Sequence, residues 1–379
     1  MTRDRTILFF VTEDWYLCSH RLPLVQAAVD AGLRTVVVTR VRDHAEPIEA
    51  TGARLIPLAL SRRSRDPWRE TKILRELIKI YREVKPDLCH HVAVKPVIYG
   101  SLAARLTGVP AVVNALGGLG HLFISQRLDV RLLRQPVKAA FKLLLAGPGR
   151  RVIIQNRDDR QLLRHHAGIP DHIFTLIAGS GVDPADYPVT PEPSGVVRAA
   201  VVSRMLWDKG IGEVVAAARL LRAWGRGVPI SLVGQPDPEN PASIPRADLD
   251  AWQAEGLVDC LGHTEDIPAI WRDHHLSILM SYREGLPRSL LESAACGRPM
   301  IAADVPGCRE VVRAGETGLL VPPRDSRALA EAICRLADDA ELRQAMGARA
   351  RAVVESEFTV AQVVEQTMGL YRELLQETR

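Results

Sequence analysis

The strongest candidate for chemistry is a pair of glutamates eight residues apart, in the run Glu284-Gly-Leu-Pro-Arg-Ser-Leu-Leu-Glu292. Glu284 is predicted to lie in a loop just past a strand, and Glu292 inside a helix that begins near Pro287. The N-terminus of such a helix offers N–H groups and the positive end of a dipole, which suit a diphosphate or a sugar oxygen. A carboxylate one turn further on can accept hydrogen bonds from a ribose diol. The spacing is common, and taken alone it is explained more simply by two surface glutamates.

A second candidate is the run from Ser203 to Gly210, which reads Ser-Arg-Met-Leu-Trp-Asp-Lys-Gly and contains Arg204 and Lys209. The run follows a predicted strand and precedes a predicted helix. Cationic side chains at the carboxyl end of a strand can neutralise a diphosphate, and the glycine allows the backbone to come close to it. Taken alone, such a run is more often an ordinary loop than a phosphate site.

A glycine cluster follows another predicted strand in the first half of the chain. It runs from Asn114 to His121 and contains Gly117, Gly118 and Gly120. Such a loop can bring backbone N–H groups to a ligand. His121 can orient a sugar hydroxyl or act as a base, although a single histidine on a loop is more often a solvated residue.

Ser19, His20 and Arg21 are predicted to open the first helix, after the strand at Thr6–Thr12. A helix N-terminus at the carboxyl end of a strand is an anion site. The segment lacks the glycines of a dinucleotide-binding fingerprint, which argues against an oxidoreductase of the Rossmann type.

No arrangement of residues indicates a metal centre or a bound cofactor. The single D-x-D motif, Asp248-Leu-Asp250, falls in a helical pattern, where the two carboxylates point to different faces. The six cysteines show neither C-x-x-C spacing nor a cluster with histidine at zinc-site spacing. We therefore expect reduced thiols in a cytosolic protein, and the residues themselves point to no metal or cofactor.

These candidates have to be positioned by the elements around them, and short apolar runs alternate with helical patterns along the chain. Predicted strands in the first half are Thr6–Thr12, Thr35–Thr39, Arg54–Pro57, Asp87–Val92, Ala111–Asn114, Arg151–Ile154 and Phe174–Ile177. Those in the second half are Val197–Ser203, Pro229–Val233, Val258–Leu261, Leu276–Met280, Pro299–Ala302 and Gly318–Val321. Helical patterns lie near 18–31, 68–84, 97–107, 126–146 and 156–167, then near 210–224, 246–255, 287–296, 326–337 and 340–354. This alternation predicts two parallel sheets with helices on both faces, an α/β fold.

A proline-rich segment from Gly181 to Gly195 separates the two series. At 379 residues the chain is long for one domain and natural for two. We predict doubly wound domains at 1–185 and 196–358, with a ligand in the cleft at the carboxyl ends of their strands. The last helix, near 360–377, is amphipathic and can pack on either domain.

The net charge of +4 hides an asymmetry between the halves. Residues 1–185 carry 28 Lys and Arg against 17 Asp and Glu, a net of +11, and the rest carry 21 against 28, a net of −7. A basic half suggests contact with an anionic surface such as lipid, although solvated arginine-rich helix faces explain it equally well. Nucleic acid is disfavoured, because the basic segment lacks a series of stacking aromatics.

Residues 121–164 concentrate this basic character, with ten Lys and Arg against three Asp and Glu, interleaved with apolar residues. A basic amphipathic helix can lie on an anionic membrane, and an ordinary helix packed on the sheet is the alternative. No apolar run is long enough for a transmembrane helix, and the apolar start is too short for a signal peptide. We expect a cytoplasmic protein, peripheral at the inner face of the cytoplasmic membrane.

In combination, the motifs of the second half resemble those of the retaining glycosyltransferases of family 4, which have the two-domain GT-B fold. Beyond the two runs described above, the resemblance rests on Gly262 with Asp266-Ile-Pro268, Ala295-Cys-Gly297-Arg-Pro299, Asp304-Val-Pro-Gly307-Cys-Arg-Glu310 and Gly315-Glu-Thr-Gly318-Leu-Leu-Val-Pro322. It covers the whole chain. With this series in order, two unrelated surface glutamates no longer explain Glu284 and Glu292.

The resemblance implies a nucleotide-sugar donor site in the second domain. Arg204 and Lys209 would bind the diphosphate, and Glu292 would hold the ribose hydroxyls. Glu284 and the backbone of Gly285, Leu286 and Pro287 would contact the transferred sugar, and Arg288 and Ser203 would also belong to the donor-binding site. The resemblance also implies that the anomeric configuration is kept, that no metal is needed, and that the final helix, about 359–379, crosses back to the first domain.

The first half resembles bacterial members of the family that extend sugars on undecaprenyl diphosphate. The implied acceptor side comprises Ser19, His20, Arg21, Lys95, Gly117, Gly118 and Gly120, with His121 as a further catalytic candidate. The chain departs from many members after its first strand, where Glu13-Asp-Trp-Tyr replaces a glycine-rich loop. Whether His20 or His121 touches the substrate stays open.

The resemblance thus predicts a hexosyl- or N-acetylhexosaminyltransferase with a nucleotide-sugar donor, UDP-linked by analogy, and a lipid-diphosphate-linked glycan as acceptor. A nucleotide-sugar 2-epimerase on the same fold and a non-catalytic nucleotide-sugar-binding protein are the alternatives. An epimerase would act on the donor without a second substrate, and a binding protein would show no turnover.

Overall fold

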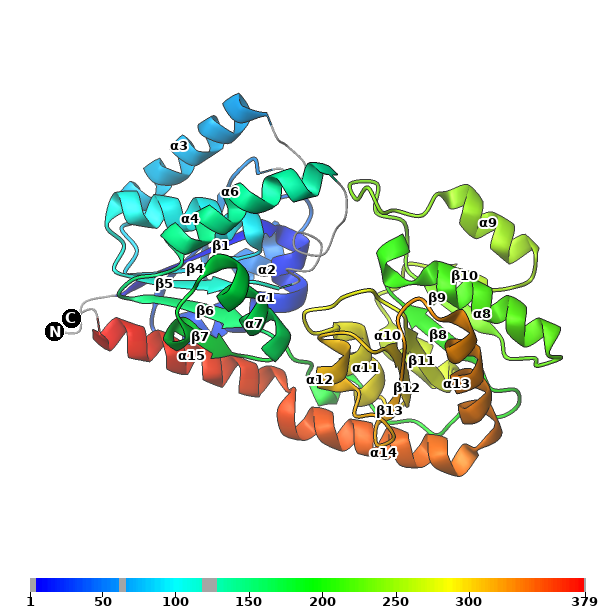
Figure 1. The fold of residues 1–379 in the computed structure, drawn as a ribbon. Coiled ribbons are helices and arrows are strands. Elements are labelled where there is room, and N and C mark those ends of the chain that lie inside the picture. Colours follow the sequence, from blue (N-terminus) through cyan, green and yellow to red (C-terminus); the bar gives the residue numbers. More distant parts are fainter. Residues whose placement is uncertain (1–4, 61–65, 118–127, 378–379) are drawn as a thin grey trace. The chain divides into compact units, whose positions relative to one another are not determined.

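The computed structural model describes residues 5–60, 66–117 and 128–377, with side chains omitted for 128–133. The chain forms two compact units, drawn in Figure 1. The first unit comprises Met1–Ser180 and Val360–Arg379, and the second comprises Gly181–Thr359. The segment 181–195, which the sequence analysis placed between the domains, is part of the second unit.

The first unit is built on a parallel sheet in the order β3-β2-β1-β4-β5-β6-β7. Its strands are β1 (Thr6–Glu13), β2 (Arg34–Arg40), β3 (Arg54–Pro57), β4 (Leu88–Val92), β5 (Ala111–Ala115), β6 (Arg150–Ile154) and β7 (Phe174–Leu176). Every residue of β1 is buried, as expected for a strand covered on both faces. The predicted doubly wound architecture is confirmed.

Helices cover both faces of this sheet (Figure 1). They are α1 (Asp14–Asp30), α2 (Ala45–Ala50), α3 (Pro67–Val84), α4 (Val94–Thr107), α6 (Leu128–Leu144), α7 (Arg157–Ala167) and α15 (Val360–Glu377). Residues of α1 and α15 share one core cluster with Phe9, whereas α3 and α4 pack with Phe10 on the other face. The sequence analysis missed α2, which has only six residues.

The final helix packs on the first unit, as the family resemblance implied. Its buried face is formed by Val363, Leu370, Tyr371 and Leu374, which join the core cluster of α1 and β1. The hydroxyl of Tyr371 also hydrogen-bonds to His90 in β4. The helix α15 is therefore part of the core of the first unit.

The second unit has its own parallel sheet, in the order β10-β9-β8-β11-β12-β13. Its strands are β8 (Ala199–Val202), β9 (Ile230–Val233), β10 (Asp259–Gly262), β11 (Leu276–Leu279), β12 (Met300–Ala303) and β13 (Gly318–Val321). The chain proceeds outward from β8 to β10 and then returns to the other side of β8 at β11. The carboxyl ends of β8 and β11 therefore flank the point where the strand order reverses, which is where open α/β sheets bind ligands.

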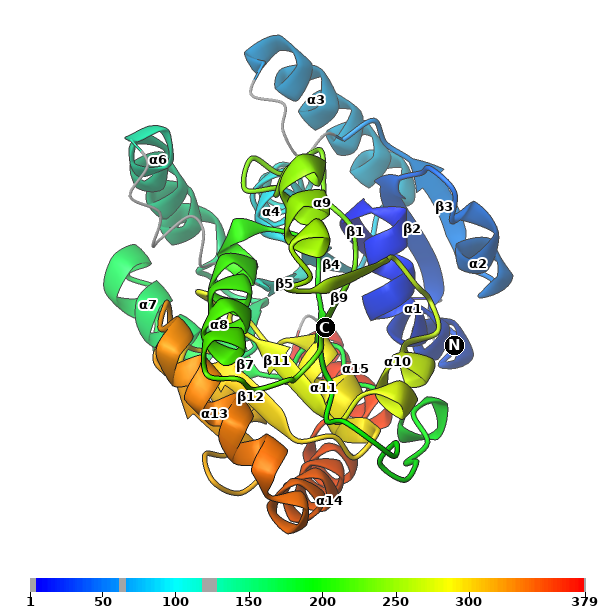
Figure 2. The same cartoon turned by 90° about the vertical axis from the view of Figure 1, so that its right-hand side faces the viewer.

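The second sheet is also covered on both faces. Its helices are α8 (Ile211–Ala223), α9 (Arg246–Ala254), α10 (Ile267–Asp273), α11 (Arg288–Ala295), α12 (Cys308–Val311), α13 (Ser326–Asp338) and α14 (Ala340–Glu357). Figure 2 shows α8 and α13 side by side on one face. The sequence analysis missed α10 and α12, which have seven and four residues. Within the described ranges, no helix combines the length and apolarity needed to cross a bilayer.

One close contact in the first unit connects α4 to β4. A Cβ atom on Gly100 would lie 2.6 Å from the ring of His91. That ring is held by the hydroxyl of Tyr81 at 2.9 Å and by Oδ1 of Asn114 at 2.8 Å. Burial lowers the pKa of His91 to about 3, so the ring is neutral, with Nδ1 donating to Asn114 and Nε2 accepting from Tyr81. The ring cannot move aside without breaking these bonds.

We predict that Gly100→Ala lowers the free energy of unfolding by about 1–3 kcal/mol, the usual cost of overpacking a core. Gly369→Ala is the matched control, because it adds the same methyl group to α15, where the only nearby atom is the end of the flexible Arg372 side chain at 3.9 Å. The control should stabilise by up to about 1 kcal/mol through helix propensity. Thermal unfolding midpoints measure both changes, and equal shifts would contradict this description of the core.

Candidate functional site

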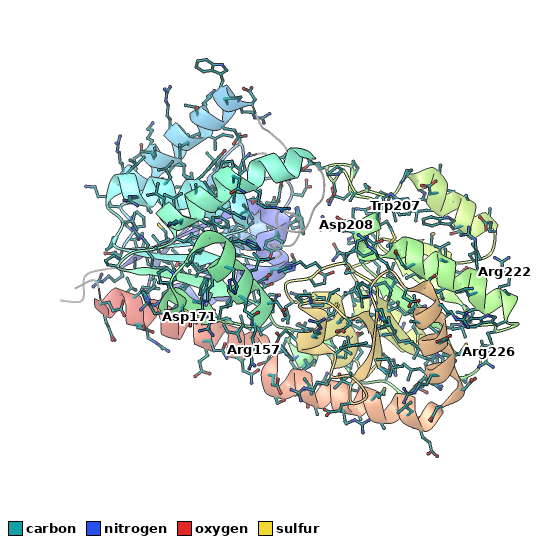
Figure 3. All side chains as sticks on the ribbon, viewed as in Figure 1. Arg157, Asp171, Trp207, Asp208, Arg222 and Arg226 are labelled. Carbon is teal, nitrogen blue, oxygen red and sulfur yellow. The ribbon has the colours of Figure 1, made fainter. Side chains whose placement is uncertain are left out.

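The loops after β8 and β11 carry the residues that the sequence analysis singled out in the second unit. Figure 3 labels Trp207 and Asp208 on the first loop, at the opposite end of α8 from Arg222 and Arg226. This loop forms a short 3-10 helix, Trp207–Lys209, and Gly210 then starts α8 with a positive φ of 70°. Both loops thus lie at the carboxyl edge of the sheet, at the point of strand-order reversal.

Lys209 and Glu284 form an ion pair between these two loops. Nζ of Lys209 lies 2.5 Å from Oε1 of Glu284, and the hydroxyl of Ser281 donates to the same oxygen at 2.5 Å. The side chains are 22% and 13% exposed, so the pair is partly shielded from water. An ammonium group has three donors, and Glu284 takes one of them in the described chain. Lys209 can therefore keep this contact and still donate to an anion.

Backbone contacts lock the loops together around this pair. The N–H of Tyr282 donates to the carbonyl of Asp208 at 3.0 Å, and the N–H of Glu284 donates to the carbonyl of Pro306 at 3.3 Å. A Cβ on Gly210 would lie 2.2 Å from the carbonyl oxygen of Met280. The approach to Met280 requires glycine at position 210, and together with the bond between Tyr282 and Asp208 it holds the loop of Lys209 against the loop of Glu284.

Arg204 stands at the carboxyl end of β8 with a different partner. Nη1 of Arg204 lies 2.8 Å from Oδ2 of Asp237, in the loop after β9. The Arg204 side chain is 46% exposed, and its bond to Asp237 uses only one of the five N–H donors of the guanidinium. The sequence analysis did not identify Asp237, because nothing in the local pattern marks it as a partner of Arg204.

The helix α11 holds the second glutamate. Pro287 is the residue before the helix rather than its first residue, with a φ of −76°, and α11 begins at Arg288. Glu292 lies one turn into α11 and is 8% exposed. Its Oε1 accepts from Nε of Arg288 at 2.8 Å and from the hydroxyl of Tyr187 at 3.1 Å. The sequence analysis missed Tyr187, which lies 105 residues away along the chain.

The second unit therefore gathers two cations, two carboxylates and a helix N-terminus at one edge of its sheet. Each carboxylate is held at a single oxygen, Glu284 by Lys209 and Ser281, and Glu292 by Arg288 and Tyr187. The second oxygen of each accepts no side-chain hydrogen bond from the described residues. Chemically, this arrangement can bind a diphosphate through the cations and hydroxyl groups through the carboxylates.

The D-x-D motif lies apart from these groups, in α9. Asp250 pairs with Arg246 at 2.9 Å on an exposed face, and Leu249 between the two aspartates is buried. Across the described part of the chain, no three His, Cys, Asp or Glu side chains are grouped so as to hold a metal ion.

In the first unit, the prediction that Ser19, His20 and Arg21 open a helix is wrong. The helix α1 begins at Asp14, so these residues lie in its second turn and cannot form an N-terminal anion site. The hydroxyl of Ser19 donates back to the carbonyl of Trp15 at 2.8 Å and contacts Nδ1 of His20 at 2.6 Å. Arg21 is buried and donates to the carbonyl of Gly179 at 2.9 Å, which indicates a structural role.

The first turn of α1 instead places a carboxylate where the anion was expected. Asp14 is fully buried, and its Oδ2 accepts from the backbone N–H groups of Arg42, Asp43 and His44. Although desolvation opposes the charge, these bonds lower the pKa of Asp14 below its ordinary value. The start of α1 therefore organises the loop after β2.

The remaining acceptor-side candidates are only partly described. Lys95 lies in the first turn of α4 and pairs with Glu70 of α3 at 2.8 Å. Gly117 lies just past β5, where a Cβ would contact Gln155 at 3.4 Å. Gly118, Gly120 and His121 lie outside the described residues. The structure thus brings the donor-side candidates together in one unit, and leaves the choice between His20 and His121 open.

Comparison with protein families matches each half of the chain separately. Residues 6–156 match the family described as Glycosyl transferase 4-like, and residues 197–339 match Glycosyl transferases group 1. The two matches correspond to the first and the second unit.

Similar proteins agree with these matches. An N,N'-diacetylbacillosaminyl-diphospho-undecaprenol alpha-1,3-N-acetylgalactosaminyltransferase of Campylobacter jejuni is 26% identical over 85% of this chain and 87% of its own. An Escherichia coli UDP-Gal:alpha-D-GlcNAc-diphosphoundecaprenol alpha-1,3-galactosyltransferase is 25% identical over 81% of this chain and 80% of its own. Among solved structures, Anabaena HepE in complex with UDP-glucose superposes with a TM-score of 0.78 at 20% identity, over 97% of this chain and 99% of its own. With two matched halves and two α/β units, the chain belongs to the GT-B glycosyltransferases of the glycosyl transferase 4-like and group 1 families.

Proposed function

We propose that this enzyme transfers a hexose or N-acetylhexosamine from a UDP-sugar to a glycan carried on a lipid diphosphate, with retention of anomeric configuration. The observation that carries the proposal is the pairing of Lys209 with Glu284, beside Arg204, at the carboxyl edge of the second sheet. The Campylobacter and Escherichia relatives act on diphospho-undecaprenol glycans by name, and the latter uses UDP-Gal. These names support the donor and acceptor classes.

Catalysis in this proposal is stabilisation of the leaving group. When the bond between the sugar and the nucleoside diphosphate breaks, negative charge develops on the departing diphosphate. Arg204 and Lys209 would take up that charge, assisted by the N-terminal dipole of α11. Since two protein cations carry this role, we propose that transfer needs no divalent metal, and that it continues in the presence of a chelator.

The carboxylates would orient the sugar nucleotide. Glu284 and the backbone of Gly285 to Pro287 would contact the transferred sugar, and Glu292 would accept from the ribose. Ser203 and Arg288 would line the same site, Arg288 through its bond to Glu292. Because Lys209 and Glu284 are in contact, the residue that binds the diphosphate and the residue that binds the sugar would hold each other in place.

The acceptor carries a lipid, so we also propose that the enzyme works at the inner face of the cytoplasmic membrane. The sequence analysis assigned this contact to residues 121–164. Within that segment, the described part of α6 buries Phe141 and Leu144 in the core of the first unit, and Val137 packs there as well. These three apolar residues are used for folding, and we propose that a second surface contributes to the contact.

The helix α3 offers that surface. Its buried face is formed by residues from Ile73 to Val84, whereas Trp68, in its first turn, is 85% exposed. At the helical repeat of 3.6 residues, four exposed cations share the side of α3 on which Trp68 lies; they are Lys72, Arg75, Lys79 and Arg82. An exposed tryptophan beside a row of cations is the chemistry of an interfacial anchor on anionic lipid.

For the donor site, we predict that Arg204→Ala and Lys209→Ala each lower kcat/KM by about 30- to 900-fold, which corresponds to about 2–4 kcal/mol of transition-state stabilisation. The assay uses UDP-N-acetylgalactosamine or UDP-galactose with short lipid-diphosphate glycans. Arg219→Ala is the control, because it removes an exposed cation of the same unit that pairs with Glu255, and should leave the rate unchanged.

Unchanged turnover in both variants would remove the leaving-group role from these residues. Incubation of the donor without acceptor distinguishes the alternative function, since a 2-epimerase converts the sugar with no second substrate. Conversion under those conditions would contradict the proposed transfer.

For the membrane surface, we predict that the double variant Lys72→Ala with Arg75→Ala binds vesicles of anionic phospholipid about 30-fold more weakly, at about 1 kcal/mol for each cation. Trp68→Ala should weaken binding by about tenfold or more through loss of buried apolar area. Trp224→Ala, which removes a 41% exposed tryptophan of the second unit, is the control. Co-sedimentation measures all three, and binding that is insensitive to the changes on α3 would rule out this surface.

A further inference from the structure

Tyr187 belongs to the segment before β8 that the sequence analysis took for a linker. It follows the short 3-10 helix Pro184–Asp186 and is 8% exposed. Its hydroxyl donates to Oε1 of Glu292 at 3.1 Å. Burial and the nearby charge of Glu292 raise the pKa of Tyr187 to about 12, so the phenol keeps its proton and remains a donor at physiological pH.

Glu292 is held from two sides at one oxygen. Arg288, one turn earlier on α11, donates to Oε1 at 2.8 Å, so Oε1 accepts from both Arg288 and Tyr187. No side chain of the described residues donates to Oε2. A buried carboxylate with one oxygen fully bonded is prepared to accept a further donor at the other oxygen.

The segment that carries Tyr187 is fastened to the same helix that carries Glu292. Nη1 of Arg351 donates to the carbonyls of Tyr187 at 2.7 Å, Ala295 at 2.5 Å and Pro184 at 3.2 Å. Ala295 is the last residue of α11, so the segment is tied to the second half of this helix, at Glu292 directly and at Ala295 through Arg351. Further along, Thr190 accepts from Nη2 of Arg298 at 2.9 Å. Tyr187 is therefore held on a fixed support rather than on a mobile connection.

We propose that Tyr187 is a positioning residue for the donor: with Arg288 it occupies Oε1 of Glu292 and thereby turns Oε2 toward a ribose hydroxyl. This inference rests on the proposed donor site and extends it to a residue outside the motifs of the second half. Tyr187 does not touch the donor, and it acts only through the carboxylate.

The test compares binding of UDP with binding of its 2′-deoxy and 3′-deoxy analogues by calorimetry. The ratio of affinities for UDP and for the weaker analogue measures recognition of the ribose. We expect Tyr187→Phe to lower this ratio by roughly fivefold, the effect of one hydrogen bond. We also expect it to raise the KM for the UDP-sugar while kcat changes less than about twofold. In a Glu292→Ala background, the additional Tyr187→Phe change should not alter the ratio further, because the interaction it supports is already absent.

The matched control is Thr190→Val, which removes one hydroxyl from the same segment without touching Glu292. If Tyr187 only stabilised the segment, both variants would weaken all three nucleotides equally, and the inference would be wrong. If Glu292→Ala lowers the affinity ratio of UDP to its deoxy analogue and Tyr187→Phe does not, the role of Tyr187 is wrong, while the proposed donor site stands. No binding of UDP, or an unchanged ratio in Glu292→Ala, would overturn the proposed donor site and this inference with it.

Thermal unfolding verifies that each variant is folded, and Glu292→Gln replaces Glu292→Ala if the smaller side chain prevents folding.

Discussion

The ammonium group of Lys209 and the carboxylate of Glu284 meet across 75 residues of chain, and the donor edge of the second unit is arranged around this contact. A partly buried ion pair is favoured when its geometry is good and further hydrogen bonds support it. Here Ser281 shares the carboxylate oxygen, and the backbone contacts of Gly210 and Tyr282 bring the two loops together. The pair keeps a positive charge at the edge of the sheet without leaving it isolated in a low-dielectric site.

The other charged groups at this edge of the sheet are also paired with an opposite charge. Asp237 holds Arg204, and Arg288 holds Glu292, so each charge has a partner before any ligand arrives. In each case donor or acceptor capacity remains for a further bond, which lets a ligand bind without breaking the existing contact. A site organised in this way needs little rearrangement when charge develops during a reaction, and such preorganisation is the main source of electrostatic catalysis.

Much of the fold could be predicted from the sequence, because strands such as β1 and β11 are mostly apolar, which favours burial on both faces. The start of α1 could not, since Glu13 and Asp14 end a strand and begin a helix without a cap, and Trp15 and Tyr16 are not characteristic of helices. The short helices α2, α10 and α12 span too few residues to show a period. Hydrophobic periodicity therefore predicts a helix or strand reliably only where the element is long enough for the pattern to repeat.

The residues of the candidate site likewise differ in whether the sequence could predict them. Arg204, Lys209, Glu284 and Glu292 lie in short runs whose order along the chain is informative, and the structure brings them to one edge. Their partners Asp237 and Tyr187 come from distant segments, and only the folded chain reveals them. The exposed Trp68 was missed for a related reason, because a basic segment elsewhere in the chain had the stronger compositional signal, and exposure is a property of the fold.

The most direct measurement of the central claim is the structure of the protein with UDP bound. The account predicts that oxygens of the diphosphate lie within hydrogen-bond distance of Arg204 and Lys209, with the contact between Lys209 and Glu284 retained. A nucleotide bound elsewhere, with these two cations still facing solvent, would contradict it.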